Sequence, residues 1–235
     1  MSTYMNVSGR IEKIAEYIAF ARIADIGTDH GYLPIFAIQS KNVEWAVAAD
    51  INEQPLLCAR ENAEAAGAAG IEFRLGYGLE VLRPGEADTI VIAGMGGKQM
   101  ADILRRGRYV ATGARQLLLS PHLDVPFVRR EVHALDFGIV AEDMVRDGGK
   151  YYNILDVRTS NIQEYDYSEE EYLLGRYLMN TRPPVFVEFC RHMAARYDKI
   201  AARIEGAPRL GEAGAVRLAE AVRLRDMYRR SAVNG

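Results

Sequence analysis

Residues 22–34 hold the feature that most constrains the fold of this chain. A short apolar run at residues 22–26 carries one acid, Asp25, and is followed by two glycines, Gly27 and Gly31, before a second apolar stretch. This order is typical of a parallel strand that turns into a helix at the carboxyl end of a sheet, where small-molecule pockets form. Glycines there let the backbone approach a ligand where a Cβ would intrude. We therefore predict that this turn borders a ligand pocket.

The acids of this turn indicate the charge of the ligand. Asp25 and Asp29 would repel the anionic pyrophosphate of a dinucleotide, and Asp25-x-Gly27 lacks the Gly-x-Gly-x-x-Gly pattern of nicotinamide-binding turns. The amino-acid end of S-adenosylmethionine carries an ammonium and a sulfonium, which carboxylates attract. We therefore expect S-adenosylmethionine as cofactor, with Asp25, Gly27, Thr28 and Gly31 in its binding turn.

Strand-like and helix-like segments alternate along most of the chain, which predicts a parallel sheet with helices on both faces. We expect strands at residues 22–26, 44–49, 71–75, 88–93 and 116–119, and helices at residues 8–19, 32–40, 52–67, 98–104 and 125–135. Two further strands, at 139–145 and 151–157, are joined by an Asp-Gly-Gly link typical of a hairpin, so the last should run antiparallel. The predicted fold class is α/β, a Rossmann-like class I methyltransferase with a mostly parallel sheet and one antiparallel strand.

The sequence changes character after Ser160. Ser168, with Glu171 three residues later, predicts a capping box at a helix start. Amphipathic stretches at about 185–204 and 211–230 predict two antiparallel helices packed as a hairpin. We therefore expect a methyltransferase domain over residues 1–160 and a C-terminal helical, coiled-coil-like domain over residues 161–235.

Composition narrows the partners and the compartment. The chain has 235 residues and a net charge of −3, which by itself argues weakly against a nucleic-acid partner. It has neither the roughly 20-residue apolar stretch of a membrane span nor a signal-peptide pattern, so we expect a cytoplasmic protein that does not enter a membrane. Cys58 and Cys190 fit no metal-ligand spacing, and we expect free thiols and no metal.

Three more loops should meet the first one at the same edge of the sheet. Asp50 closes the second strand, where an acid can accept hydrogen bonds from ribose hydroxyls. Tyr77 follows the third strand between two glycines, where it could stack on an adenine ring. Three glycines in four residues follow the fourth strand, around Met95, and bring the backbone close to a ligand. We expect these loops to bind the cofactor through Asp50, Ile51, Gly76, Tyr77, Gly78, Ala93, Gly94 and Met95.

The acceptor should lie next to the cofactor, beside the fourth and fifth strands. The second half of the glycine-rich loop and the loop after the fifth strand lie there, and proline stiffens the exit from that strand. We expect the substrate pocket to be shaped by Gly96, Gly97, Ser120, Pro121 and His122.

The strings at residues 25–34, 76–81 and 92–97 resemble the TrmK family of bacterial tRNA methyltransferases, and the resemblance covers nearly the whole chain. It implies S-adenosylmethionine-dependent methylation of N1 of adenine 22 in tRNA, with a C-terminal hairpin that helps hold the tRNA. Members of the family often have Gly-Asp-Gly-Leu where this chain has Tyr77 in the second position, and Gln-Pro-Asn at residues 120–122. Monomer and homodimer both stay open.

Such an enzyme must mainly align the attacking nitrogen, the methyl carbon and the sulfur, because adenine N1 already has a free lone pair at neutral pH. Its product is a cation, so a carboxylate near the N1 and N6 edge would stabilise the developing charge or accept an N6 proton. Asp29 is the first candidate, with His30 and Tyr32 as helpers. Two alternatives stay open: a methyltransferase for another RNA position or a small molecule, and a non-catalytic S-adenosylmethionine-binding module.

Overall fold

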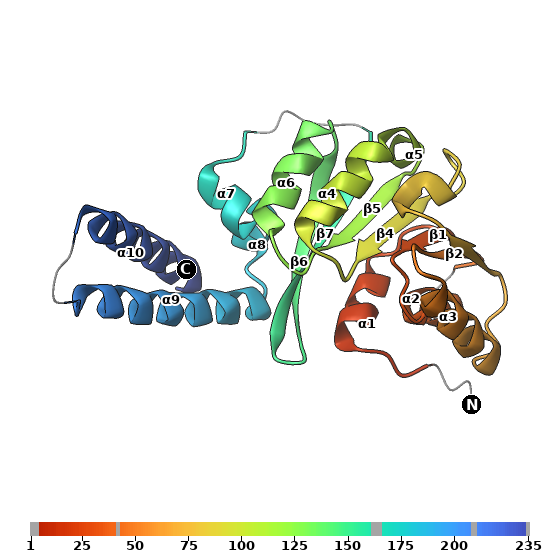
Figure 1. The fold of residues 1–235 in the computed structure, drawn as a ribbon, viewed down its shortest axis with the longest axis horizontal. Coiled ribbons are helices and arrows are strands. Elements are labelled where there is room, and N and C mark those ends of the chain that lie inside the picture. The colour runs from red at the N-terminus through yellow and green to blue at the C-terminus, as the bar shows by residue number, and fades with distance from the viewer. Residues whose placement is uncertain (1–4, 41–42, 161–165, 208–210, 234–235) are drawn as a thin grey trace. The chain divides into compact units, whose positions relative to one another are not determined.

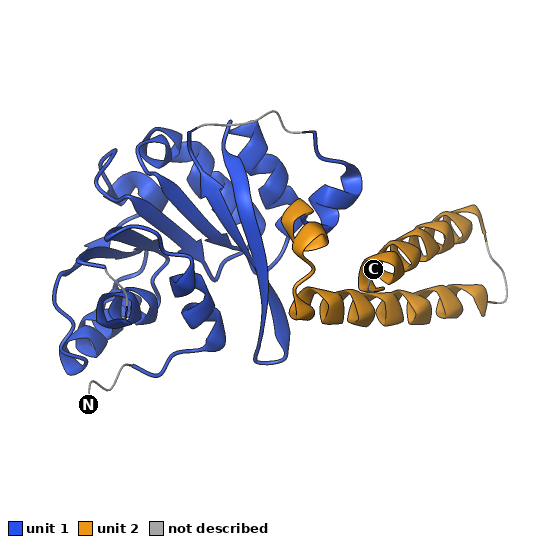
Figure 2. Cartoon of the chain, turned by 180° about the vertical axis from the view of Figure 1, so that it is seen from behind, with its two compact units in different colours: residues 1–175 blue, residues 176–235 orange. Residues whose placement is uncertain are grey.

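The chain folds into two compact units, Met1–Gly175 and Arg176–Gly235, drawn in different colours in Figure 2. The structure is a computed structural model that describes residues 5–40, 43–160, 166–207 and 211–233. None of the helices in these ranges is both long enough and apolar enough to cross a bilayer. The same ranges contain no cluster of His, Cys, Asp and Glu that could hold a metal ion.

A seven-stranded sheet forms the centre of the first unit, in the order β3-β2-β1-β4-β5-β7-β6 (Figure 1). Its strands are β1 (Arg22–Ile26), β2 (Trp45–Asp50), β3 (Ile71–Leu75), β4 (Thr89–Ala93), β5 (Gln116–Ser120), β6 (Gly138–Asp147) and β7 (Lys150–Arg158). The first five pair in parallel, whereas β7 runs antiparallel to both β5 and β6. The predicted class I methyltransferase fold with one antiparallel strand is confirmed.

Helices cover both faces of this sheet, as the right-handed crossover between parallel strands requires. They are α1 (Gly9–Glu16), α2 (Tyr32–Ser40), α3 (Glu53–Ala65), α4 (Gly97–Arg106), α5 (Arg108–Thr112), α6 (Val125–Ala134) and α7 (Glu169–Leu174). In Figure 1, α1, α2 and α3 lie on one side of the sheet, and α4 and α6 on the other. The structure adds two short elements that the sequence did not predict, α5 and the 3-10 turn η1 (Gly78–Val81).

The central strands are buried on both faces, which explains why they appear in the sequence as nearly uninterrupted apolar runs. All five residues of β5 are buried, as are the last four of β1. Ala24, Val47 and Leu117 are each 0% exposed. A strand buried in this way cannot shift its register without moving apolar side chains, so the positions of the strand ends are fixed.

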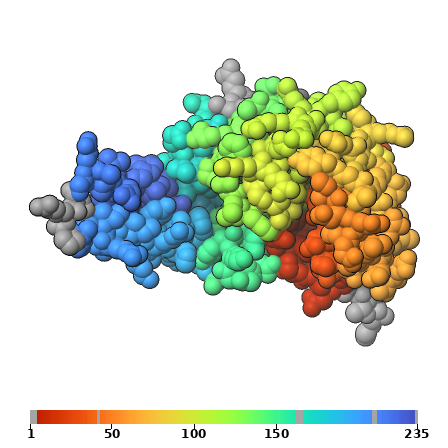
Figure 3. Space-filling model, viewed as in Figure 1, coloured from red at the N-terminus to blue at the C-terminus, as the bar shows by residue number. Residues whose placement is uncertain are grey.

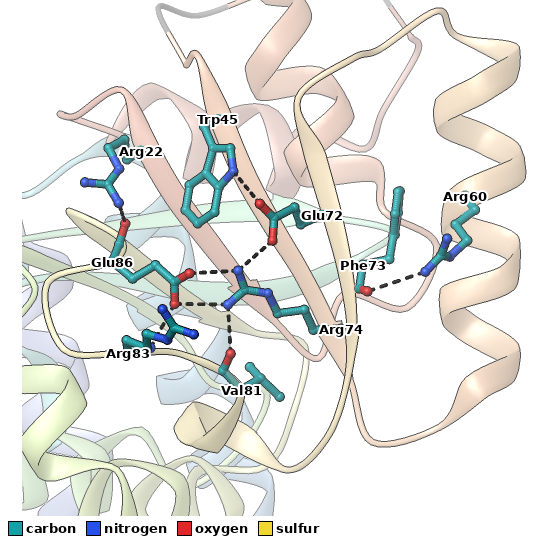
Figure 4. Close-up of polar contacts among 9 residues, drawn as sticks. All are labelled: Arg22, Trp45, Arg60, Glu72, Phe73, Arg74, Val81, Arg83 and Glu86. Atoms are coloured by element: carbon teal, nitrogen blue, oxygen red, sulfur yellow. Dashed lines mark hydrogen bonds and ion pairs between the residues drawn. The ribbon is translucent and has the colours of Figure 1, made fainter.

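The edge strand β3 carries a polar network instead (Figure 4). The Arg74 guanidinium donates to Glu72 at 2.6 Å and to Glu86 at 2.7 Å, and Trp45 Nε1 donates to Glu72 at 3.1 Å. The hydrogen bonds from Arg74 lower the pKa of the Glu86 carboxyl to about 2. Because Glu86 lies in the segment between η1 and β4, this network ties that segment to the edge of the sheet.

A buried ion pair holds the end of the first unit. Arg129 of α6 donates from Nε to Glu142 of β6 at 2.6 Å, and their side chains are only 1% and 0% exposed. Its Nη1 also donates to the backbone carbonyls of Tyr172 (2.9 Å) and Leu173 (3.2 Å), near the C-terminal end of α7, where helix carbonyls lack partners. These hydrogen bonds join α7 to α6. This explains why α7 belongs to the first unit and the units divide after Gly175. The domain boundary expected after residue 160 stays a prediction, and residues 161–165 lie outside the described ranges.

The second unit contains α8 (Arg176–Thr181), α9 (Pro184–Glu205) and α10 (Glu212–Ala232). Tyr228, late in α10, stacks on Tyr197 with ring centroids 5.8 Å apart and meets Phe189 edge-on at 5.9 Å. Residues early in α9 thus contact residues late in α10, which confirms the predicted helical hairpin. Cys190 is buried in this unit as a free thiol, and Cys58 is free in the first unit.

We predict that Arg129→Ala lowers the free energy of unfolding by about 3–5 kcal/mol, because it leaves the buried Glu142 carboxylate without this cation. Chemical denaturation measures the loss. As a control, Arg223→Ala removes an exposed pair with Glu220 and should leave the unfolding midpoint unchanged. Equal losses in the two variants would contradict a special role for the buried pair.

Candidate active site

A cavity of about 460 Å³ opens at the carboxyl ends of β1, β2 and β4. Its volume is in the usual range for small-molecule sites, and it lies where the strand order reverses between β1 and β4. Most of the residues predicted for the site line it. They are Asp25, Gly27, Thr28, Asp29, His30, Tyr32, Asp50, Ile51, Gly76, Tyr77, Gly78, Ala93, Gly94, Met95 and His122.

Five predicted residues lie outside the lining: Gly31, Gly96, Gly97, Ser120 and Pro121. A Cβ at Gly31 would come within 2.9 Å of Ala59 Cβ, and one at Gly97 within 2.7 Å of a backbone carbonyl oxygen. These two glycines therefore allow loops to pack on neighbouring elements. Ser120 and Pro121 are buried at the end of β5.

Asp25 is the most deeply buried acid of the cavity, with 5% exposure. Burial raises the pKa of its carboxyl to about 6; the nearby Asp50 carboxylate adds to this rise, and the Arg10 guanidinium opposes it. Burial disfavours the charged form of an acid, and a cationic group in the same cavity offsets that cost. The cavity therefore has a negative centre that matches a cation.

Asp50 connects two of the loops. Its Oδ1 accepts a hydrogen bond from the Asn52 amide at 2.8 Å, and its backbone carbonyl accepts one from Gly76 at 3.0 Å. The other carboxylate oxygen makes no hydrogen bond within the described part of the chain. Next to it, Ile51 is 58% exposed and offers an apolar surface beside the acid. This pairing suits a ligand that joins hydroxyl groups to a flat apolar ring.

The glycine turns after β1 and β4 approach each other closely. Gly27 has a φ of +81°, and a Cβ there would come within 2.9 Å of Met95 Cε. Met95 in turn accepts a hydrogen bond at its carbonyl from the His122 amide at 2.9 Å. The loops after β1, β4 and β5 therefore form one wall.

Asp29, His30 and Tyr32 form the rim of the cavity. Asp29 adopts a left-handed backbone, with φ of +48°, and its side chain is 76% exposed. His30 Nε2 lies 3.6 Å from Asp29 Oδ1, and the His30 and Tyr32 rings are 5.4 Å apart. The structure thus brings the three candidate catalytic residues together, with a carboxylate presented to an incoming group.

Two residues of α4, Asp102 and Arg106, hold the Tyr77 side chain in place. Its hydroxyl donates to Asp102 Oδ2 at 2.6 Å, which raises the Tyr77 pKa, and the Arg106 guanidinium lies 5.2 Å from its ring centroid. The ring therefore has a defined orientation in the cavity wall, as stacking on a flat ligand would require.

Comparison with known proteins gives independent evidence on this cavity. Residues 7–155 match the family described as methyltransferase domain. The chain belongs to this methyltransferase family. It is 37% identical over 153 residues to the tRNA (adenine(22)-N(1))-methyltransferase of Bacillus subtilis, an alignment that spans 64% of each protein.

Solved structures extend the match to the helical hairpin. The m1A22 tRNA methyltransferase TrmK of Bacillus subtilis is 28% identical with a TM-score of 0.82, over 97% of this chain and 99% of that one. Sp1610 of Streptococcus pneumoniae, solved in complex with S-adenosyl-L-methionine, is 28% identical with a TM-score of 0.80, over 97% and 100%. The resemblance of the sequence to the TrmK family is confirmed.

Several residues of this methyltransferase cavity were missed from the sequence. The largest group comes from α1, with Arg10, Ile11 and Ile14, and the others are Ile26, Leu33, Ala49, Asn52, Pro55, Gln99 and Ile103. Nothing in the spacing of residues connects α1, which precedes the first strand, to a loop far along the chain. Among the described residues that line the cavity, Arg10 carries the only permanent positive charge.

Gly96 and Gly97 give a matched pair of variants. Gly97→Ala would force a Cβ to within 2.7 Å of the Leu123 carbonyl oxygen, and should lower the free energy of unfolding by about 1–3 kcal/mol. Gly96 has φ of −68°, and a methyl group added there would meet no atom within 4 Å, so Gly96→Ala should change stability by less than about 1 kcal/mol. Thermal or chemical unfolding compares them, and the reverse order would refute the packing role of Gly97.

Proposed function

We propose that this chain transfers the methyl group of S-adenosylmethionine to N1 of adenine 22 in tRNA. The observation that carries the proposal is the likeness to the m1A22 methyltransferase TrmK along 97% of the chain, the helical hairpin included. The acidic cavity at the sheet edge supplies an independent argument from chemistry. Because tRNA is a cytoplasmic substrate, we also propose that the protein is cytoplasmic, as its sequence led us to expect.

The cavity fits the proposed cofactor. When bound, S-adenosylmethionine supplies an electrophilic methyl group on a sulfonium. The buried Asp25 carboxylate complements the cationic amino-acid end, and Asp50 has a free oxygen for the ribose hydroxyls. Ile51 and Tyr77 flank the place of the adenine ring, and Gly27 leaves room for a close approach beside Met95.

Asp29 carries the proposed proton chemistry. The lone pair of the target N1 forms the new bond to carbon as the carbon–sulfur bond breaks, and the positive charge passes to the base. Asp29, exposed at the rim, stabilises that charge or takes a proton from N6, with His30 and Tyr32 beside it. A target base buried in tRNA must first leave its stack.

The remaining predicted residues shape the acceptor side. Met95 and His122 line the cavity, whereas Gly96, Gly97, Ser120 and Pro121 are close to them in the sequence but outside the lining. We assign to those four the support of the acceptor loops, without direct contact to the base.

Nucleoside mapping by mass spectrometry tests the proposal directly. tRNA transcripts with adenine or another base at position 22 are incubated with the protein and labelled S-adenosylmethionine. N1-methyladenosine only in the first transcript supports the proposal. Methylation elsewhere, or of a small molecule, would replace the substrate, and tight cofactor binding without transfer would indicate a non-catalytic module.

The ionisation of Asp25 predicts how cofactor binding depends on pH. Its carboxyl, with a pKa of about 6, becomes protonated as the pH falls, which relieves its burial cost but removes the charge that attracts the cation. Affinity for S-adenosylmethionine should fall about tenfold from pH 7.5 to pH 5. Calorimetry measures it, and Asp25→Asn should bind weakly at both pH values. An unchanged pH dependence in that variant would exclude Asp25 as its source.

Asp29→Asn tests the proposed catalytic carboxylate. Asparagine tolerates the left-handed backbone of this position but cannot take a proton or carry the charge. Turnover should fall by about 10²–10⁴ with little change in cofactor affinity. Asp136, another exposed acid with positive φ, gives the control Asp136→Asn, which should keep full turnover. Unchanged turnover in the Asp29 variant would remove this residue from the mechanism.

The helical hairpin offers one face for the tRNA backbone. Arg196, Lys199 and Arg203 are exposed at helical spacing on α9, and no ion pair or hydrogen bond involves them within the described ranges. On α10, by contrast, three arginines are paired with acids: Arg223 with Glu220, Arg225 with Asp226, and Arg229 with Asp198.

Replacing the three α9 cations by glutamine should weaken tRNA binding and reduce the slope of log affinity against log salt by about 2–3, as expected for three phosphate contacts. Filter binding or fluorescence titration at several salt concentrations measures the slope. The matched control changes Arg223, Arg225 and Arg229 to glutamine, with the same loss of formal charge. An equal effect of the control would show that only net charge matters.

A further inference from the structure

Three elements meet at the acceptor side of the cavity through Arg10, His122 and Tyr152. Arg10 Nη1 of α1 lies 2.6 Å from His122 Nε2, in the loop after β5. The Arg10 guanidinium is 5.0 Å from the ring centroid of Tyr152 on β7, and the His122 ring is 5.4 Å from the same ring. In Figure 3 the red segment of α1 lies between the green hairpin end of β6 and β7 and the orange segment of α2 and α3.

The contact with Arg10 determines which nitrogen of His122 carries the proton. A guanidinium only donates hydrogen bonds, so His122 Nε2 must accept and the ring proton belongs on Nδ1. Burial, the Arg10 charge and the Lys150 charge lower the pKa of His122, in that order. The charged groups that act on the ring are therefore both cations, and the ring is neutral at pH 7.

His122 Nδ1–H is then a donor without a partner in the described part of the chain, in a residue that lines the cavity. The backbone of the same residue is fixed, because its amide donates to the Met95 carbonyl at 2.9 Å. On the rim, Asp29 presents a hydrogen-bond acceptor. A residue with an acceptor and a residue with a donor thus line the same cavity.

We propose that His122 donates from Nδ1 to N7 of the target adenine, and that Arg10 is the positioning residue that holds His122 in this tautomer. This inference rests on the proposed function. Adenine presents an N6–H donor beside the N7 acceptor, which matches a carboxylate beside an N–H group. Guanine presents two acceptors there, so the Asp29 carboxylate would face O6 and reject it. The bond to N7 leaves N1 free for the methyl group.

A substrate with 7-deazaadenosine at position 22 tests the bond, because a C–H group replaces N7. Wild-type turnover on this tRNA should fall about tenfold relative to adenosine, the usual effect of one lost hydrogen bond. In His122→Ala, adenosine and 7-deazaadenosine should react at equal, reduced rates. An equal slowing by 7-deazaadenosine in both proteins, or no slowing in wild type, would overturn the proposal.

Two substitutions at the same position separate the two ring nitrogens. His122→Asn keeps a donor near the place of Nδ1 and should stay sensitive to 7-deazaadenosine. His122→Gln keeps an acceptor near the place of Nε2 for Arg10 but no donor at Nδ1, and should lose that sensitivity. The opposite result would mean that His122 acts through Nε2.

Arg10→Ala supplies a readout that a merely structural role would not move. Without Arg10 either ring nitrogen of His122 can carry the proton, so Arg10→Ala should discriminate less between adenosine and 7-deazaadenosine than wild type does, whereas a merely structural loss would slow both substrates equally. Long-range ¹⁵N NMR of the resting wild-type protein should show the proton on Nδ1 of His122, and mixed tautomers in the variant. A proton on Nε2 in wild type would refute the inference whatever the activity. Failure of the proposed function itself would appear separately, as absence of methyl transfer to unmodified tRNA.

Discussion

The register of the parallel strands is the constraint on which the site depends. Ile26, the last residue of β1, pairs with Ala49 on one side and Ile92 on the other, so three strands end at the same level of the sheet. β1 and β4 then continue into turns that contain glycines, and β2 itself ends on Asp50. Because the strands are buried on both faces, their ends cannot slide, and loops distant in sequence are brought to one cavity. The chemistry of the site follows from this alignment.

The charges of the cavity are arranged in two parts. Asp25 lies at its buried centre, where removal from water makes the charged form costly and a bound cation valuable. Arg10 lies on the acceptor side and contacts His122, which it keeps unprotonated at Nε2. A negative centre and a cationic flank fit the two halves of a methyl transfer, in which the donor is positively charged and the acceptor must keep its lone pair.

The sequence predicted those features that arise from local patterns. The strand at residues 22–26 and the helix at 32–40 have the predicted bounds, since an apolar run interrupted by Gly27 and Gly31 has few other solutions. The roles of Gly31 and Gly97 were not predictable, because a glycine that touches a ligand and one that packs on Ala59 or Leu123 look alike in sequence. Arg10 was missed for another reason: only the tertiary fold brings α1 to the loop after β5.

The network around Arg74 has a consequence for the molecule in acid. Strand β3 lies at one edge of the sheet, and an edge strand can pair with a strand from another molecule. Arg74 lowers the pKa of Glu72 as well as that of Glu86, so both carboxylates stay ionised in solutions acidic enough to neutralise ordinary ones. The edge strand therefore keeps its charged side chains at low pH. These charges oppose strand pairing between molecules at pH values where many proteins begin to aggregate.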